Sequence, residues 1–262
     1  MRYLKNQVKQ KLRSGQSVIG SWINLPCLET VEIMARMDFD FLVVDEEHTS
    51  LNFETIQKMA MVMEGYGKPP YIRVSENDPG IIKKALDAGY YGIIVPMINS
   101  KKEAQKAVES VFYPPQGKRG VGLSRAQGYG TEFEVYKKWY EKNISLVAQI
   151  EHVQGIANLE DILSIDELDA TMIGPYDLSA SLGHPGEFQR QEVKKELEKY
   201  ERISKKMQKP YGQHIVQLDH RVVTDKVKKG YQFLAYGIDE LFFARSCQQE
   251  LNLIKQNVSI KS

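Results

Sequence analysis

From residue 17 onward the chain alternates eight times between a short run rich in β-branched residues and a segment with apolar residues three and four apart. Short apolar runs are typical of buried strands, and three-and-four spacing is typical of a helix with one apolar face. Strictly alternating strands and helices predict a parallel sheet covered by helices. The predicted strands are Ser17–Asn24, Phe39–Glu46, Pro70–Ser75, Tyr91–Ile98, Ser145–Glu151, Ala170–Pro175, Tyr211–Val216 and Gln232–Gly237.

Eight such pairs in 262 residues predict an α/β fold of the (β/α)8 barrel (TIM barrel) type, and we interpret residues 1–262 as a single barrel domain. The competing fold is a doubly wound open sheet, which needs a glycine-rich turn after its first strand to bind a nucleotide. Here that turn reads NLPCLET. Before the barrel, Leu4, Val8 and Leu12 lie four apart, which predicts a short N-terminal amphipathic helix and not a secretory signal.

Composition excludes several classes of partner. The 35 basic and 34 acidic residues are interspersed, which indicates no nucleic-acid binding. No apolar run approaches the roughly 18 residues that span a bilayer, so we expect no membrane association. Cys27 and Cys247 are far apart and form no CxxC pair. Free thiols favour a reducing compartment, and we expect a cytoplasmic protein.

Reactive side chains gather at the carboxyl ends of the predicted strands, where barrels carry their chemistry. They are Trp22, Asp45, Glu46, Glu47, His48, Arg73, Gln149, Glu151 and Asp177. Glu151 and Asp177 come from neighbouring strands, and paired carboxylates are the oxygen ligands that magnesium or manganese prefers. Alternatively, Glu151 forms a salt bridge or caps the next helix. Gln149, two residues earlier on the same face of its strand, favours the metal site.

His48 and Arg73 are the further candidates for catalysis. A histidine in this position can be structural, but a nearby carboxylate in DEEH raises its pKa and fixes its tautomer, as a general base requires. Arg73 forms either a surface ion pair or a contact to a carboxylate or enolate oxygen. The other four histidines, His152, His184, His214 and His220, are weaker candidates.

Two features of the strands and turns narrow the chemistry. None of the predicted strands carries an interior lysine, which argues against a Schiff-base mechanism. The turns after strands seven and eight, VQLDHR and YGIDELFF, are not glycine-rich, which argues against a phosphorylated substrate.

The chain resembles the class II (metal-dependent) pyruvate aldolases that act on 2-keto-3-deoxy acids, including hydroxyoxoheptanedioate, deoxyglucarate and deoxyrhamnonate aldolases. The matching segments, which span most of residues 17–240, are FDFLVVDEEHTS, YIRV, KKALDAGYYGIIVPMI, GKRGVG, LVAQIE and MIGPYDLSASLGHPG. GPYDLSASLG downstream of QIE is the most specific. The resemblance implies reversible cleavage of a 4-hydroxy-2-oxo acid to pyruvate and an aldehyde, through an enolate that a divalent metal stabilises. Magnesium or manganese is expected, with cobalt and zinc as alternatives.

The resemblance also implies roles for individual residues. Glu151 and Asp177 are implied as metal ligands, and Gln149 and the backbone at Tyr176 as contacts to the pyruvate moiety, with Asp177 and Trp22 as further candidate substrate contacts. His48 is implied as the base, Arg73 as the group that stabilises the enolate, and Asp87 as the acid that makes the histidine more basic. Asp87 lies late in the third barrel helix, so it is expected to act across a subunit boundary. The family's barrels are hexamers, and we expect a homo-oligomer, either a trimer or a hexamer.

Two departures from the family pattern leave the aldehyde open. DEEH places Glu46 where the family often has a small or neutral residue, which is expected to alter the pKa of His48. The loop between Arg119 and Arg125 is shorter than in the heptanedioate enzymes, where this region helps to select the aldehyde. Two alternatives stay open as well: a lyase of the same barrel type that decarboxylates oxaloacetate or cleaves an acyl-CoA ester, and a non-catalytic barrel.

Overall fold

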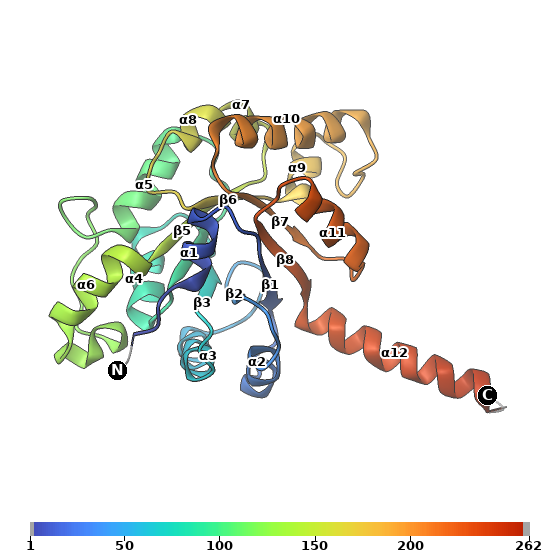
Figure 1. Ribbon diagram of the computed structural model, residues 1–262, viewed down its shortest axis with the longest axis horizontal. Helices are drawn as coiled ribbons and strands as arrows, with labels where there is room; N and C mark the ends of the chain where they lie inside the picture. The colour runs from blue at the N-terminus through green and yellow to red at the C-terminus, as the bar shows by residue number, and fades with distance from the viewer. Residues whose placement is uncertain (1–2, 259–262) are drawn as a thin grey trace.

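The computed structural model describes residues 3–258 and contains a closed barrel of eight parallel strands in the order β1 to β8 (Figure 1). Every strand begins and ends within its predicted range or one residue beyond it, so the prediction of a (β/α)8 barrel is confirmed. The strands are β1 Val18–Ile23, β2 Phe41–Asp45, β3 Pro70–Arg73, β4 Gly92–Val95, β5 Ser145–Ile150, β6 Ala170–Ile173, β7 Tyr211–Ile215 and β8 Phe233–Ile238.

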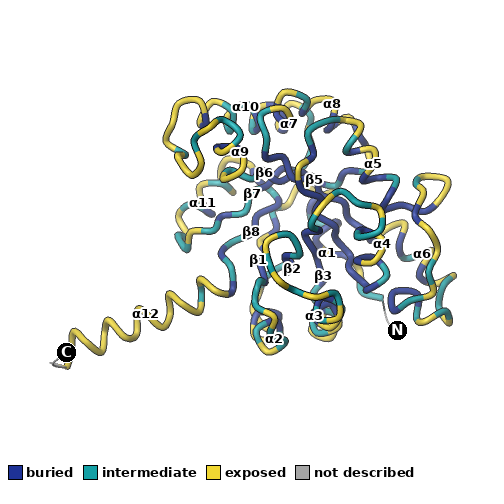
Figure 2. The backbone as a smooth tube through the Cα atoms, turned by 180° about the vertical axis from the view of Figure 1, so that it is seen from behind, coloured by how far each residue is buried: buried dark blue, intermediate teal, exposed yellow. Residues whose placement is uncertain are grey.

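Helices follow the strands and surround most of the barrel (Figures 1 and 2). In α4, the Asp78 side chain accepts hydrogen bonds from two amides of the first turn, and Gly89 ends the helix with φ of 103°. The helices are α1 Gln7–Arg13, α2 Leu28–Ala35, α3 Phe53–Gly65, α4 Pro79–Ala88, α5 Lys101–Val111, α6 Phe133–Asn143, α7 Val153–Ala157, α8 Leu159–Leu163, α9 Pro175–Ser181, α10 Gln191–Met207, α11 His220–Lys228 and α12 Asp239–Asn257.

The N-terminal helix α1 closes the amino end of the barrel. Val8 and Leu12 are buried in the cluster that fills the barrel interior, as their spacing predicts. Lys9 is buried too, and its Nζ lies 3.0 Å from Asp169 Oδ2 at the amino end of β6. This lysine therefore lies at the end of the barrel opposite to the predicted site, and the eight strands themselves contain no lysine.

The long segment between α5 and α6 contains regular structure. Its last part forms the short 3₁₀ helix η1, Arg125–Gly130. Arg119 is buried and donates a hydrogen bond from its NH2 to Asp87 Oδ1 at 2.7 Å and another from its NH1 to the Tyr136 hydroxyl at 3.0 Å. These contacts hold the segment against α4 and α6.

The last helix, α12, leaves the barrel instead of packing along it (Figure 1). Of its 19 residues only Asp239, the first, is buried. Asp239 accepts hydrogen bonds from the amides of Asn24 and Leu25 and so fixes the start of the helix to the end of β1. The rest of the helix exposes apolar side chains, including Phe243 at 70% and Ile254 at 50%.

Candidate active site at the carboxyl end of the barrel

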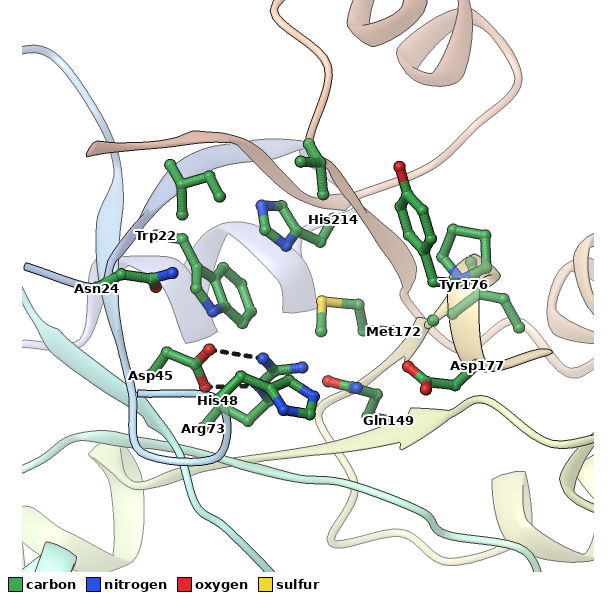
Figure 3. Close-up of a pocket in the computed structure, with 15 residues that line it drawn as sticks. Trp22, Asn24, Asp45, His48, Arg73, Gln149, Met172, Tyr176, Asp177 and His214 are labelled. Carbon is green, nitrogen blue, oxygen red and sulfur yellow. Dashed lines mark hydrogen bonds and ion pairs between the residues drawn. The ribbon is translucent and has the colours of Figure 1, made fainter. Parts of the chain in front are cut away.

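Six of the predicted site residues line one cavity at the carboxyl end of the strands (Figure 3). They are Trp22, His48, Arg73, Gln149, Tyr176 and Asp177. Asp45, Asn24 and His214 line the same cavity. The parallel strands bring these side chains together because all eight carboxyl ends open on the same face of the barrel.

Arg73 is held by carboxylates on two sides. The strand register pairs Asp45 with Arg73, and the two side chains form a two-point ion pair, with Nε 2.9 Å from Oδ1 and NH2 2.7 Å from Oδ2. Arg73 NH1 lies 3.1 Å from Glu47 Oε2. Such paired contacts fix the orientation of the guanidinium plane as well as the position of its charge.

Glu47 is a partly buried carboxylate of the same group. Burial raises its pKa to about 7, and the negative charges of Glu151, Asp45 and Asp177 add to this effect, while Arg73 opposes it. Asp45 and Asp177 line the cavity and Glu47 lies beside them, whereas among the lining residues that the structure describes Arg73 is the only lysine or arginine. The cavity carries an excess of negative charge.

Glu151 lies just behind the cavity wall and is buried. Its Oε1 accepts a hydrogen bond from the Met97 amide at 2.7 Å, and its Oε2 accepts one from the side-chain amide of Gln149. Burial raises the pKa of Glu151, and the neighbouring Asp177 charge adds to the rise. The backbone of Gly174 passes so close that a Cβ there would lie 2.6 Å from Glu151 Oε2.

His48 stands at the rim of the cavity with its side chain 63% exposed. Its Nε2 lies 3.8 Å from Glu47 Oε2. Glu46 is directed elsewhere, because its carboxylate accepts a hydrogen bond from the Ser75 amide. The carboxylate beside His48 is therefore that of Glu47.

Asp87 is not brought into this cavity. It lies in α4 and accepts hydrogen bonds from Arg119 NH2 and from the side-chain amide of Gln127. The segment that contains Arg119 and Arg125 contacts α4 and is absent from the cavity lining that the structure describes. Within one chain, neither Asp87 nor this segment contacts the site.

His214 is a site residue that the sequence ranked only among the weaker candidates. Its ring stacks on Trp22 with centroids 4.4 Å apart and planes 12° apart, while the Arg73 guanidinium lies 5.4 Å from the Trp22 ring (Figure 3). The signal that could have found it is its place next to the end of β7, where alternate side chains point into the barrel.

Within residues 3–258, no group of three or more histidine, cysteine, aspartate or glutamate side chains is arranged to hold a metal ion. Within the same residues, no helix has both the length and the apolar composition needed to cross a membrane.

The closed parallel barrel and its polar cavity at the carboxyl ends of the strands place the chain in the class of (β/α)8-barrel enzymes. More closely, residues 19–246 match the HpcH/HpaI aldolase/citrate lyase family, and the chain belongs to this family.

Named relatives cover nearly the whole chain. A pyruvate aldolase of Rhizobium etli is 36% identical over 244 residues, covering 93% of this chain and 95% of that protein. A 5-keto-4-deoxy-D-glucarate aldolase of Escherichia coli is also 36% identical, over 94% of this chain and 95% of the relative. A crystal structure of an HpcH/HpaI family protein from Burkholderia cenocepacia superimposes with a TM-score of 0.91 at 25% identity, covering 96% of this chain and all of that one. The resemblance to 2-keto-3-deoxy acid aldolases is thereby confirmed at the level of the family.

Proposed function

We propose that the protein is a metal-dependent carbon–carbon lyase that cleaves a 4-hydroxy-2-oxo acid reversibly to pyruvate and an aldehyde. The observation that carries the proposal is the arrangement at one cavity: Arg73, fixed by Asp45, lines it together with Gln149 and Asp177, and Glu151 lies behind the wall in contact with Gln149. The names of the two aldolases at 36% identity support it.

The residues present fit a divalent cation. Burial raises the pKa of Glu151, the negative charge of Asp177 adds to the rise, and a bound cation would relieve the cost of the ionised Glu151. Gln149 Oε1 is buried without a partner among the described residues and would accept a hydrogen bond from a ligand or water bound at this site. Two protein carboxylates leave further positions for water and substrate, which is typical of magnesium or manganese. Glu151 and Asp177 would hold the ion, and cobalt or zinc remain alternatives.

Each residue has a role in this proposal. The metal, when bound, supplies positive charge that favours the enolate. Arg73 donates hydrogen bonds to the same developing oxyanion, and its orientation is set before the substrate arrives. Gln149 and the backbone amide of Tyr176 bind the oxo acid. His48, at the open rim, takes the proton from the substrate hydroxyl when the bond breaks and returns it in the reverse direction.

The assay follows pyruvate release from a panel of 4-hydroxy-2-oxo acids, with oxaloacetate and an acyl-CoA ester as additional substrates. We expect release that stops when EDTA removes the metal and returns with Mg²⁺ or Mn²⁺. Cleavage that survives complete metal removal contradicts the mechanism, and turnover of oxaloacetate alone favours the decarboxylase alternative. No turnover of any of these substrates favours a non-catalytic barrel.

We propose further that the protein forms a homo-oligomer in which α12 of one copy packs on another copy. In a (β/α)8 barrel the eighth helix normally packs beside β8 and β1, but here α12 points away. It leaves an apolar cleft beside α2, lined by Leu25, Ile33, Met34, Met37 and Phe39. Ile33 and Met37 are 60% and 49% exposed. Reciprocal exchange of the helix joins copies in pairs, which favours a hexamer over a trimer.

In such an assembly, a neighbouring copy must approach Asp87 for this residue to act on His48, because Asp87 lies outside the cavity of its own chain. Its expected role therefore depends on the homo-oligomer. The two free cysteines, Cys27 and Cys247, support a reducing cytoplasmic location.

A further inference from the structure

The cavity has a second wall, formed by the ends of β7, β8 and β1. In the strand order β1 lies four strands from β5, so the β1 part of this wall faces Glu151 across the barrel, whereas β7 adjoins β6, the strand that leads to Asp177. In Figure 3, Trp22 and His214 accordingly lie on one side, and Gln149 and Asp177 on the other. Val216 and Ile238 make the second wall largely apolar. If pyruvate binds at Gln149 and Arg73, the rest of the substrate extends towards this wall.

His214 presents a hydrogen-bond acceptor on this wall. Its Nε2 lies 3.0 Å from the Gly237 carbonyl oxygen, and a carbonyl can only accept, so Nε2 carries the hydrogen. Burial, with a contribution from Arg73, lowers the pKa of His214 to about 4, and the ring is therefore neutral at pH 7. A neutral ring with its hydrogen on Nε2 has a lone pair on Nδ1. Among the described residues, none donates a hydrogen bond to this nitrogen.

Asn24 presents a second acceptor. Its backbone amide is fixed by Asp239 at 3.0 Å, and its side-chain Oδ1 is buried without a partner among the described residues. A buried polar atom without a partner destabilises the fold, because it has lost its hydrogen bonds to water and forms none with the protein. Two such acceptors, beside the Nε1–H of Trp22, which is also buried without a partner among the described residues, favour a ligand with hydroxyl groups at this position, since a hydroxyl both donates and accepts.

The same wall offers no cation for an anionic group. Of the residues that line the cavity in the described part of the chain, Arg73 is the only lysine or arginine; it pairs with Asp45 and Glu47, and its remaining N–H groups are assigned to the pyruvate half. A second carboxylate on the aldehyde would add negative charge to a cavity that already has an excess of it.

We propose that His214 Nδ1 and Asn24 Oδ1 accept hydrogen bonds from hydroxyl groups of the aldehyde half, so that the preferred aldehyde is neutral and hydroxylated and not aliphatic or carboxylated. This inference rests on the proposed aldolase function and names its second substrate. His214 thus selects the aldehyde and takes no part in forming the enolate.

The test measures aldol addition of pyruvate to three aldehydes: glyceraldehyde, propanal, which has the same carbon chain without hydroxyls, and succinic semialdehyde, which carries a carboxylate. We expect the highest kcat/KM with glyceraldehyde. In His214→Leu, which keeps apolar bulk but has no acceptor, the ratio of glyceraldehyde to propanal falls by about fivefold to tenfold. In His214→Asn, whose side-chain oxygen can replace Nδ1, the ratio returns towards the wild-type value.

Two further measurements separate this inference from the proposed function. Deuterium exchange into the methyl group of pyruvate in D₂O reports enolate formation without any aldehyde. The aldol rate of each variant is divided by its rate of deuterium exchange. If the wild type shows neither exchange nor addition to any aldehyde, the proposed function fails and this inference with it. If exchange and addition occur but the ratio is unchanged in His214→Leu and in Asn24→Leu, or succinic semialdehyde is preferred, this inference alone is overturned.

Discussion

Asp45 and Arg73 lie opposite each other at the ends of β2 and β3 and form a buried ion pair with two hydrogen bonds, of 2.9 and 2.7 Å. The pair places a cation with a fixed orientation at the centre of an otherwise acidic cavity. A lysine would supply the charge but not the planar two-point contact.

Asp45→Asn removes the charged partner and keeps its shape. Breaking a buried pair leaves a charge without compensation, and because Glu47 still contacts Arg73 we expect a loss of about 2 to 3 kcal/mol in the free energy of unfolding. We also expect a fall of about a hundredfold in kcat/KM, because Arg73 loses its fixed direction. Urea unfolding and steady-state kinetics measure the two effects.

Glu32→Gln is the control. It removes the partner of Arg36 in an exposed pair and should leave the unfolding midpoint nearly unchanged. Equal effects of the two substitutions would refute this reasoning.

Glu151→Gln is expected to stabilise the metal-free protein while weakening metal binding. The folded-state pKa of Glu151 is raised by burial, so its ionised form destabilises the fold increasingly as the pH rises above the ordinary glutamate value. A neutral amide avoids this cost, and the Gln149 amide can turn to present Oε1, its unpartnered atom. Thermal melting with EDTA should show a higher Tm, and Mn²⁺ titration should show affinity lower by about tenfold or more. A lower Tm together with unchanged Mn²⁺ affinity contradicts the assignment of Glu151 as a ligand.

The low folded-state pKa of His214 predicts that the folded protein loses stability in acid. Its folded-state pKa of about 4 lies below the ordinary value of 6.5, so between these values the unfolded chain binds more protons than the folded one. Stability should therefore fall as the pH drops from 6.5 to 4, with His214 contributing up to about 3 kcal/mol. Urea unfolding of the wild type and of His214→Leu across this range isolates the effect. Parallel curves for the two proteins would show that the ring is not neutral in the fold.

Gly174→Ala tests how tightly Glu151 is packed. The added Cβ would lie 2.6 Å from Glu151 Oε2 and 2.8 Å from its Cβ, so the carboxylate must move. We expect Mn²⁺ affinity to fall by about tenfold and stability by about 1 to 3 kcal/mol. Gly65→Ala is the matched control, because its Cβ meets open space near the end of α3. That substitution should leave metal binding unchanged, and a similar loss in both variants would mean that Glu151 is not constrained by Gly174.

Phe243→Asp tests the proposed role of α12 in assembly. Phe243 is 70% exposed and borders the apolar cleft beside α2, so a charge there should prevent another copy from packing on this face. Light scattering after size-exclusion chromatography should show smaller species than for the wild type. Gln248→Asp adds the same charge farther along α12, where the native side chain is already polar and exposed. A wild-type monomer, or an unchanged assembly in Phe243→Asp, would reject the exchange of α12.

The elements of the fold were predictable because their signals are local. Apolar spacing identified all eight strands and the N-terminal helix, and the residue types at strand ends identified Arg73 and Gln149. The path of residues 113–129 was harder to predict, because Arg119 gains its partners, Asp87 and Tyr136, only from other elements. The direction of α12 was not predictable either, since an apolar helix face does not specify which surface it covers.

The sequence by itself determined that eight strands alternate with helices and that polar side chains follow several of them, because periodicity and strand ends depend only on near neighbours in the chain. Only the tertiary structure decided which of those side chains meet. Closure of the barrel brings β7 within reach of β1 and so stacks His214 on Trp22, and the register of β2 with β3 brings Asp45 to Arg73. These contacts join residues far apart in the chain, and they arise from strand order and register, which no local pattern records.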